Sequence, residues 1–171
     1  MPRVPLVPQE THDAVLRPIF EVFTTSNRDV PDLYRALGNA PTLLKAWTDF
    51  AWPLRHEAST PRSLRELAIL RVAQMTGADF EWKAHSAFAL KNGVTQQQLD
   101  ELDAWRVSTN FSDDERAMLA FTEQLTTNLA VDDETFAPLH ERWSAPEIVE
   151  LILTVSFYSC VSRVLNSLQI H

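Results

Sequence analysis

Residues 63–93 read SLRELAILRVAQMTGADFEWKAHSAFALKNG. Apolar residues recur at helical spacing in the first half of this stretch, which opens with Ser63 and Glu66 at the spacing of a capping box. In a capping box, a hydroxyl and a carboxylate three residues apart bond the first free amides of a helix. Asp79 is placed to cap a second helix, which would end at Gly93. The stretch therefore predicts two consecutive helices.

The rest of the chain also predicts helices. Three more pairs have capping-box spacing, namely Thr95 with Gln98, Ser112 with Glu115, and Ser144 with Glu147. Further helices are expected near residues 12–24, 30–38 and 42–53, and a last one from Ser144 to about Gln169. Asp132 is expected to start another helix, which Pro138 should disturb because proline lacks an amide hydrogen. We find no sustained alternation of polar and apolar residues that would indicate strands, so the predicted fold class is all-α.

Length and composition indicate one domain. The chain has 171 residues, of which 45% are hydrophobic, enough for one sizeable core. The prediction is a single-domain helix bundle over residues 1–171, in which residues 1–11 form an extended, proline-containing arm. The three glycines each stand where a helical pattern ends, and a left-handed backbone is expected at all three, Gly38, Gly77 and Gly93.

Charge and cysteine content narrow the possible partners and the compartment. The chain has 15 basic and 23 acidic residues and a net charge of −8, which disfavours binding to nucleic acid or to an anionic membrane surface. The N-terminus lacks the apolar core of a secretory signal. The single cysteine, Cys160, allows no internal disulfide and suits a reducing compartment, so we expect a cytoplasmic protein. Cys160 is expected to be buried and chemically inert.

The most apolar segment, residues 148–164, is expected to form a buried helix. It is interrupted by Glu150, Ser156, Ser159, Ser162 and Arg163, so its apolar run falls short of the roughly 20 residues that cross a bilayer. Because the segment is apolar on nearly all sides between Ile148 and Phe157, it should lie at the centre of the bundle or in a subunit interface.

The residues with most chemical potential are Glu81 and His85, which share one helix face because they are four positions apart. A carboxylate beside an imidazole raises its pKa and fixes its tautomer, and Trp82 on the same side would exclude water. This pattern favours a proton-transfer site, with Glu66 of the preceding helix as a second carboxylate. The alternatives are an ordinary surface Glu–His pair and, for Glu66, the capping box that already accounts for it.

Several segments together resemble the carboxymuconolactone decarboxylase-like family, which includes the alkylhydroperoxidase D proteins. The central match comprises residues 65–73, Glu81-Trp-Lys-Ala-His85 and Ala89-Leu-Lys-Asn-Gly93. Outer matches include Leu37-Gly-Asn-Ala-Pro41 with Trp47, and Glu150, Tyr158, Arg163 and Asn166. The resemblance covers about residues 30–170 and implies the helical fold of that family and a homo-oligomer, a trimer or a hexamer.

The chain departs from the peroxidase branch of this family at the reactive thiols. That branch has a Glu, then Cys-x-x-Cys, then a His four residues after the second cysteine. On this pattern Glu66 and His85 match, whereas Ala78 and Glu81 stand where the cysteines would be. Peroxide reduction by that route needs one thiolate to attack and a second thiol to resolve the sulfenic acid, so no thiol peroxidase activity is predicted.

The remaining pattern is similar to the decarboxylase side of the family and implies a lyase without a cofactor. In this interpretation His85 donates a proton or stabilises charge, Glu81 orients it, Glu66 positions it or relays the proton, and Trp82 forms a dry wall. The substrate would be a small carboxylated lactone or a β-keto-acid-like molecule. Its carboxylate needs a cation, for which Arg71 and Arg163 are the candidates; helical arginines are also common salt-bridge partners.

Three alternatives stay open. The three site residues also form a weak candidate for metal ligation, although no metal is predicted. The second alternative to a lyase is an antioxidant relative without the thiol pair. The third is a non-catalytic oligomer that binds a partner or a small ligand. An enzyme should bury Glu66, Glu81 and His85 together around one pocket with a shifted histidine pKa, whereas a scaffold should leave them apart or exposed.

Overall fold

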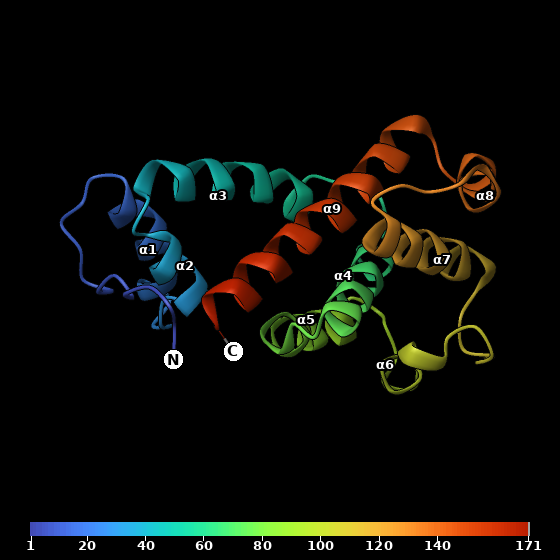
Figure 1. The fold of residues 1–171 in the computed structure, drawn as a ribbon, viewed down its shortest axis with the longest axis horizontal. Coiled ribbons are helices and arrows are strands. Elements are labelled where there is room, and N and C mark those ends of the chain that lie inside the picture. The colour runs from blue at the N-terminus through green and yellow to red at the C-terminus, as the bar shows by residue number, and fades with distance from the viewer. Residues whose placement is uncertain (171) are drawn as a thin grey trace. The chain divides into compact units, whose positions relative to one another are not determined.

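A computed structural model describes residues 1–170, and all regular secondary structure in that range is helical. The α-helices are α1 Leu16–Thr24, α2 Asp32–Leu37, α3 Pro41–His56, α4 Arg62–Thr76, α5 Asp79–Lys91, α6 Gln96–Asp100, α7 Asp113–Asn128, α8 Asp133–Arg142 and α9 Ala145–Leu168, with a short 3-10 helix at Leu102–Ala104. The all-α prediction is confirmed (Figure 1). The described residues fall into two compact units, and α9 belongs to both.

The first unit comprises residues 1–57 and the end of the chain from Leu165. Helices α1 and α2 pack against α3 around a small apolar core of Leu16, Phe20, Val30 and Leu44. The N-terminal arm has no helix before α1, as expected. It is bound by backbone hydrogen bonds: the Arg3 amide donates to the Leu168 carbonyl at 2.9 Å and the Val7 amide donates to the Arg35 carbonyl at 3.1 Å.

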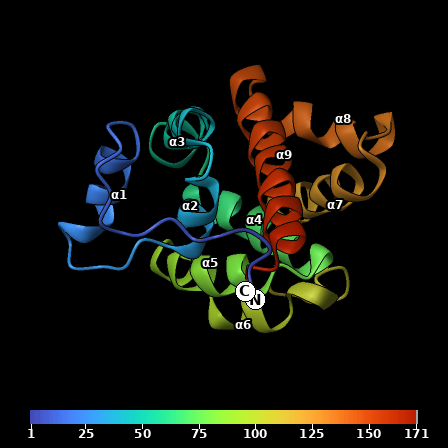
Figure 2. The same ribbon diagram turned by 60° about the vertical axis from the view of Figure 1, so that its left-hand side comes forward.

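The second unit, Ala58–Val164, is built on α4. Helices α5 and α7 pack against α4, and α8 packs against α7; two views show α5 and α7 on different sides of α4 (Figure 1 and Figure 2). Leu67, Ala68, Leu70 and Val72 of α4 are fully buried. A helix covered on several sides is apolar around most of its circumference, which is why α4 lacks a simple polar face.

The helix-start predictions are mostly confirmed. Complete capping boxes stand at Thr95 with Gln98 and at Ser112 with Glu115, and Glu147 accepts hydrogen bonds from the amide and hydroxyl of Ser144 at 2.8 and 2.7 Å. Asp132 caps α8 by accepting from the Thr135 amide at 2.8 Å. Pro138 lies inside α8, which continues across it to Arg142, so the expected disturbance does not end this helix.

Two predicted helix starts are wrong. Pro61, not Ser63, occupies the N-cap of α4, and the helix begins at Arg62 without a side-chain cap. The fixed φ of Pro61 presets the backbone just before the helix, so the helix begins without a side-chain acceptor. In α5, Ala78 is the N-cap and Asp79 is the first helical residue, where its charge still complements the positive end of the helix dipole.

The glycines divide by backbone conformation. Gly77 and Gly93 have φ of +63° and +101°, as predicted for helix ends. The prediction for Gly38 is wrong, because its φ is −59°. A Cβ at Gly38 would lie 3.1 Å from the Arg35 carbonyl oxygen and 3.2 Å from Cγ2 of Val7, so close packing rather than a left-handed turn explains this glycine.

Replacing Gly77 with alanine is expected to lower the free energy of unfolding by about 1 kcal/mol, because an L side chain is strained at this positive φ. Nothing lies within 4 Å of the added Cβ, so the effect should come from the backbone alone. Urea unfolding of Gly77→Ala and of wild type measures it. An unchanged midpoint would show that the α4–α5 turn does not need the left-handed residue.

Helix α9 is buried on one side and exposed on the other. The prediction that Cys160 is buried is wrong: its side chain is exposed, on the same helical stripe as Val149 and Leu153, which are 51% and 36% exposed. By length and composition alone, this helix could cross a membrane. However, 56% of its most apolar 18-residue stretch is buried inside the protein. Core helices pass the same test, so this is weak evidence for a membrane span.

Candidate active site

The α4–α5 turn brings three predicted site residues together. Gly77 ends α4 in the left-handed conformation, and the Ala78 amide donates to the Ala73 carbonyl at 2.9 Å. This closure turns the chain back so that α5 packs against α4. Glu66 on α4 then meets Glu81 and His85, which lie one turn apart on α5.

His85 lies between the two carboxylates. Its Nδ1 is 2.7 Å from Oε2 of Glu66, and its Nε2 is 3.3 Å from Oε2 of Glu81. The side chains of His85, Glu66 and Glu81 are 8%, 0% and 6% exposed. All three side chains are therefore buried, and that of Glu66 is buried completely.

Glu66 has a different partner from the one that capping predicts. It is fully buried, and its Oε1 forms an ion pair with Arg62 one turn earlier on α4, while its Oε2 is bonded to His85. The capping interpretation is wrong because the helix starts before Ser63. Sequence analysis missed Arg62, although its spacing of four residues before Glu66 is a standard ion-pair spacing on helices.

The contact between Glu81 and His85 is looser than the one to Glu66. At 3.3 Å it is an ion pair without the alignment of a hydrogen bond, and Oε2 of Glu81 is buried without a hydrogen-bond partner among the described residues. Glu81 is in the first turn of α5, where the helix dipole stabilises a carboxylate. His85 is thus held more closely through Nδ1 by Glu66 than through Nε2 by Glu81.

The two carboxylates control the protonation of His85. Burial, the largest single influence, lowers the pKa of His85, but the contacts with Glu66 and Glu81 and the charges of both carboxylates raise it, and the net result is a pKa above the ordinary value of 6.5. The physical cause is that the imidazolium form balances negative charge that is buried beside it. The protonated ring is therefore favoured more than in an ordinary histidine, and this form has a proton to donate.

Two aromatic side chains lie against the imidazole, and Trp82 lies at a nearby cavity. Tyr158 of α9, which is 2% exposed, contacts it edge-on with ring centroids 4.9 Å apart, and Phe88 lies 6.1 Å away and is 51% exposed. Trp82 is half-buried and lines a cavity of about 270 Å³ with Ala73, Gln74, Gly77 and Asp79. Apolar walls reduce the dielectric constant near His85 and strengthen its coupling to the carboxylates.

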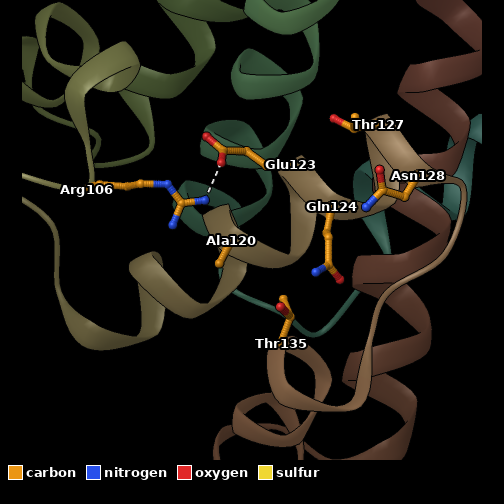
Figure 3. A pocket seen from close by; sticks show the side chains of 7 residues that line it. All are labelled: Arg106, Ala120, Glu123, Gln124, Thr127, Asn128 and Thr135. Atoms are coloured by element: carbon orange, nitrogen blue, oxygen red, sulfur yellow. Dashed lines mark hydrogen bonds and ion pairs between the residues drawn. The ribbon is translucent and has the colours of Figure 1, made fainter.

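The two arginines predicted to bind a substrate carboxylate, Arg71 and Arg163, lie in surroundings different from those of His85. Arg71 is bonded to Glu123 of α7 through Nε at 2.9 Å and through a second nitrogen at 2.5 Å, and Arg106 binds the other oxygen of Glu123 at 2.5 Å. Figure 3 shows this Arg106–Glu123 pair at a cavity of about 270 Å³ on α7. Arg163 is exposed on α9. Neither arginine has a recorded contact with Glu66, Glu81 or His85, so the structure does not bring them into that cluster.

Metal ligation, the weaker hypothesis for the same residues, has no further support from the geometry. Within residues 1–170 no group of three or more His, Cys, Asp or Glu side chains is arranged to hold a metal ion. The two carboxylates instead approach opposite nitrogens of one imidazole, an arrangement that favours a protonated ring over a metal-bound one.

The raised pKa makes part of the folding stability dependent on pH. Because the pKa of His85 is higher in the folded protein than its ordinary value, its stabilising contribution is complete below about pH 6.5 and is lost as the pH rises through the folded pKa. We expect the free energy of unfolding of wild type, minus that of His85→Gln, to fall as the pH rises from 6 to 9. Urea unfolding at a series of pH values measures this difference, and a flat difference would contradict the raised pKa.

Comparisons with known proteins identify the family and support the fold. Residues 41–124 match the model of the carboxymuconolactone decarboxylase family. The uncharacterized protein YdfG of Bacillus subtilis is 31% identical over 110 residues, which are 63% of this chain and 75% of that protein.

Two solved structures show the same fold. An uncharacterized peroxidase-related protein from Ralstonia eutropha, described as an alkylhydroperoxidase AhpD core, is 17% identical to this chain and has a TM-score of 0.83. The match covers 99% of this chain and 91% of that protein. The debrominase Bmp8 is 18% identical with a TM-score of 0.82, covering 97% and 90%. The fold class is therefore that of the AhpD-like helical proteins. The chain belongs to the carboxymuconolactone decarboxylase family, and the predicted resemblance is confirmed.

Proposed function

We propose that this protein is a cofactor-free acid–base enzyme, a decarboxylase-like lyase that acts on a small carboxylated lactone or a β-keto-acid-like substrate. The observation that carries the proposal is the buried cluster in which His85 bridges Glu66 and Glu81. A purely structural helix pair has no need to bury two carboxylates around one histidine, because desolvating charges costs several kcal/mol per ion. Perturbed ionisable groups gathered in this way are typical of functional sites.

The chemistry follows from the proton that His85 holds. When the bond to CO2 breaks, its electron pair passes into the neighbouring conjugated carbonyl and gives an enolate. The imidazolium of His85 stabilises this charge and donates its proton, after which solvent returns a proton to the imidazole. Glu66 keeps Nδ1 occupied at 2.7 Å, which leaves Nε2 as the nitrogen that faces the substrate. Glu81 keeps the ring protonated before the reaction.

The lack of a thiol pair at the site accounts for the predicted absence of thiol peroxidase activity. Ala78 and Glu81 stand where a thiol pair would be needed, and the single thiol, Cys160, is exposed on α9. Neighbours with this fold include a debrominase and a peroxidase-related protein. One fold supports several chemistries, so the proposal here depends on the residues of the cluster and not on the fold.

The proposal includes a homo-oligomer in the cytoplasm. Large apolar side chains of the second unit are exposed, namely Phe88 at 51%, Leu90 at 42%, Val149 at 51% and Leu153 at 36%. Exposed apolar side chains of this kind support association with another chain. Sedimentation of the purified protein tests the state of assembly.

Release of CO2 tests the proposed reaction. Purified protein is incubated with carboxylated γ-lactones and with β-keto acids of increasing size, and CO2 is measured by a coupled or isotopic assay against a blank without protein. We expect at least one substrate class to lose CO2 faster than the blank, with a rate that falls as the pH rises through the raised pKa of His85. The absence of acceleration for every member of both classes would overturn the lyase assignment.

A further inference from the structure

We infer that Arg62 is a fourth member of the acid–base site, a positioning residue whose charge makes the proton on His85 easier to release. The inference rests on the proposed function and names a residue that acts through Glu66 rather than on the substrate. Arg62 forms an ion pair with Oε1 of Glu66, and Nδ1 of His85 lies 2.7 Å from Oε2 of the same carboxylate. One buried carboxylate thus joins the guanidinium to the imidazole.

The first argument is the balance of charge. Glu66 and Glu81 approach opposite nitrogens of the imidazole of His85, so a protonated ring beside the two carboxylates leaves one negative charge uncompensated. The side chains of these three residues are at most 8% exposed, and little water can offset that charge. An uncompensated charge in such surroundings is strongly unfavourable. Arg62 supplies the missing positive charge.

The second argument is how tightly His85 holds its proton. Burial lowers the pKa of His85, but the contacts with Glu66 and Glu81 and their charges raise it above its ordinary value. An acid that holds its proton too tightly donates it slowly, and the most effective pKa lies near the working pH. A positive charge on the far oxygen of Glu66 repels the imidazolium. Arg62 therefore offsets part of the rise that the two glutamates cause.

The third argument is that the charge of Arg62 acts on other buried groups around Glu66. Arg65 is 4% exposed, and its pKa lies below the ordinary value because of burial first and the charge of Arg62 second. Glu150, Glu66 and Tyr158 act on Arg65 in the opposite direction, and Tyr158 also contacts the imidazole of His85 edge-on from α9. Arg65 and Glu150 have opposite charges and offset each other. Arg62 is thus coupled electrostatically to the buried groups around the imidazole.

The alternative role for Arg62 is mechanical, and it predicts the opposite change. If Arg62 only held Glu66 in place, its replacement would loosen the 2.7 Å contact with Nδ1, and His85 would hold its proton less tightly. If the charge of Arg62 matters, its replacement removes a repulsion, and His85 would hold its proton more tightly. The direction in which the titration of His85 moves therefore separates the two roles.

Titration of His85 by NMR tests the inference without any turnover. Arg62→Gln and Arg62→Met both remove the charge, so that one neutral variant is available if the other does not fold, and Arg62→Lys keeps the charge. Arg17→Gln is the matched control, because Arg17 also pairs with a glutamate four residues later on its helix, but its side chain is 65% exposed. We expect the titration midpoint of His85 to rise by about one pH unit in the neutral variants. Arg62→Lys and Arg17→Gln should titrate as wild type.

An unchanged or lower midpoint in a folded neutral variant, or an equal rise in Arg62→Lys, would overturn the inference. These outcomes differ from failure of the proposed function, which is read from CO2 release, because the midpoint of His85 can rise in a protein that releases no CO2. If CO2 is released, the pH at which the rate falls should move upward in the neutral variants by the same interval as the midpoint.

Discussion

Glu66→Ala is expected to lower the free energy of unfolding by about 3 kcal/mol, near the lower limit of values for breaking a buried ion pair. Glu66 is fully buried and partners both Arg62 and His85. Its loss leaves a buried cationic cluster without its central carboxylate and opens a small cavity. The cost stays near the lower limit because His85 can release its proton and the Arg62 side chain is 22% exposed.

Urea unfolding at pH 7 measures this loss as a shift in midpoint at unchanged slope. Glu66→Gln is the matched variant, since it keeps an acceptor for Nδ1 of His85 and the volume of the side chain while removing the charge. It should lose less stability than Glu66→Ala and should lower the pKa of His85. An effect below about 1 kcal/mol for Glu66→Ala, the typical size for an ordinary substitution, would show that Glu66 is not the centre of the cluster.

His85→Gln is expected to reduce CO2 release 10² to 10⁴-fold, the range for loss of a general acid or base (about 10²–10⁴). The proposal assigns the transferred proton to Nε2, and glutamine can occupy the space and keep hydrogen bonds but cannot deliver a proton. The reduction should appear in kcat more than in KM, because the interaction strengthens only as the enolate forms.

Steady-state assays on the best substrate of the CO2 screen measure this ratio. His12→Gln is the control, because His12 is an exposed histidine that directly follows the N-terminal arm, and its activity should equal that of wild type. If His85→Gln retains more than a tenth of the wild-type kcat, the acid is a different residue and the assignment of roles in the cluster is wrong.

Much of the site was predictable from local sequence because it depends on helical spacing. Glu81 and His85 are four residues apart, and this alone placed them on one face of α5. Gly77 predicted the turn that returns α5 to α4, and this turn brings Glu66 to His85 at 2.7 Å. The confirmed capping boxes at Thr95 and Ser112 follow from equally local rules.

What failed depends on packing between segments distant in sequence. Arg71 faces α7 and is bonded to Glu123, 52 positions further along the chain, and no spacing rule within α4 predicts this. Cys160 is exposed because only one side of α9 is covered, although its sequence is apolar on nearly all sides. Tyr158 contacts His85 from α9, a contact that only the tertiary fold reveals.

The account depends on a protonated His85 held by two carboxylates, and the titration of its imidazole by NMR measures this directly. Spectra of wild type, with the His85 signals assigned through His85→Ala, are recorded from pH 5 to 10 and repeated for Glu81→Gln. We expect the wild-type ring to titrate above the ordinary histidine value of about 6.5 and to titrate at lower pH in Glu81→Gln. A titration near 6.5 that is the same in both proteins would contradict the coupled acid–base site and leave a structural or binding role as the better account.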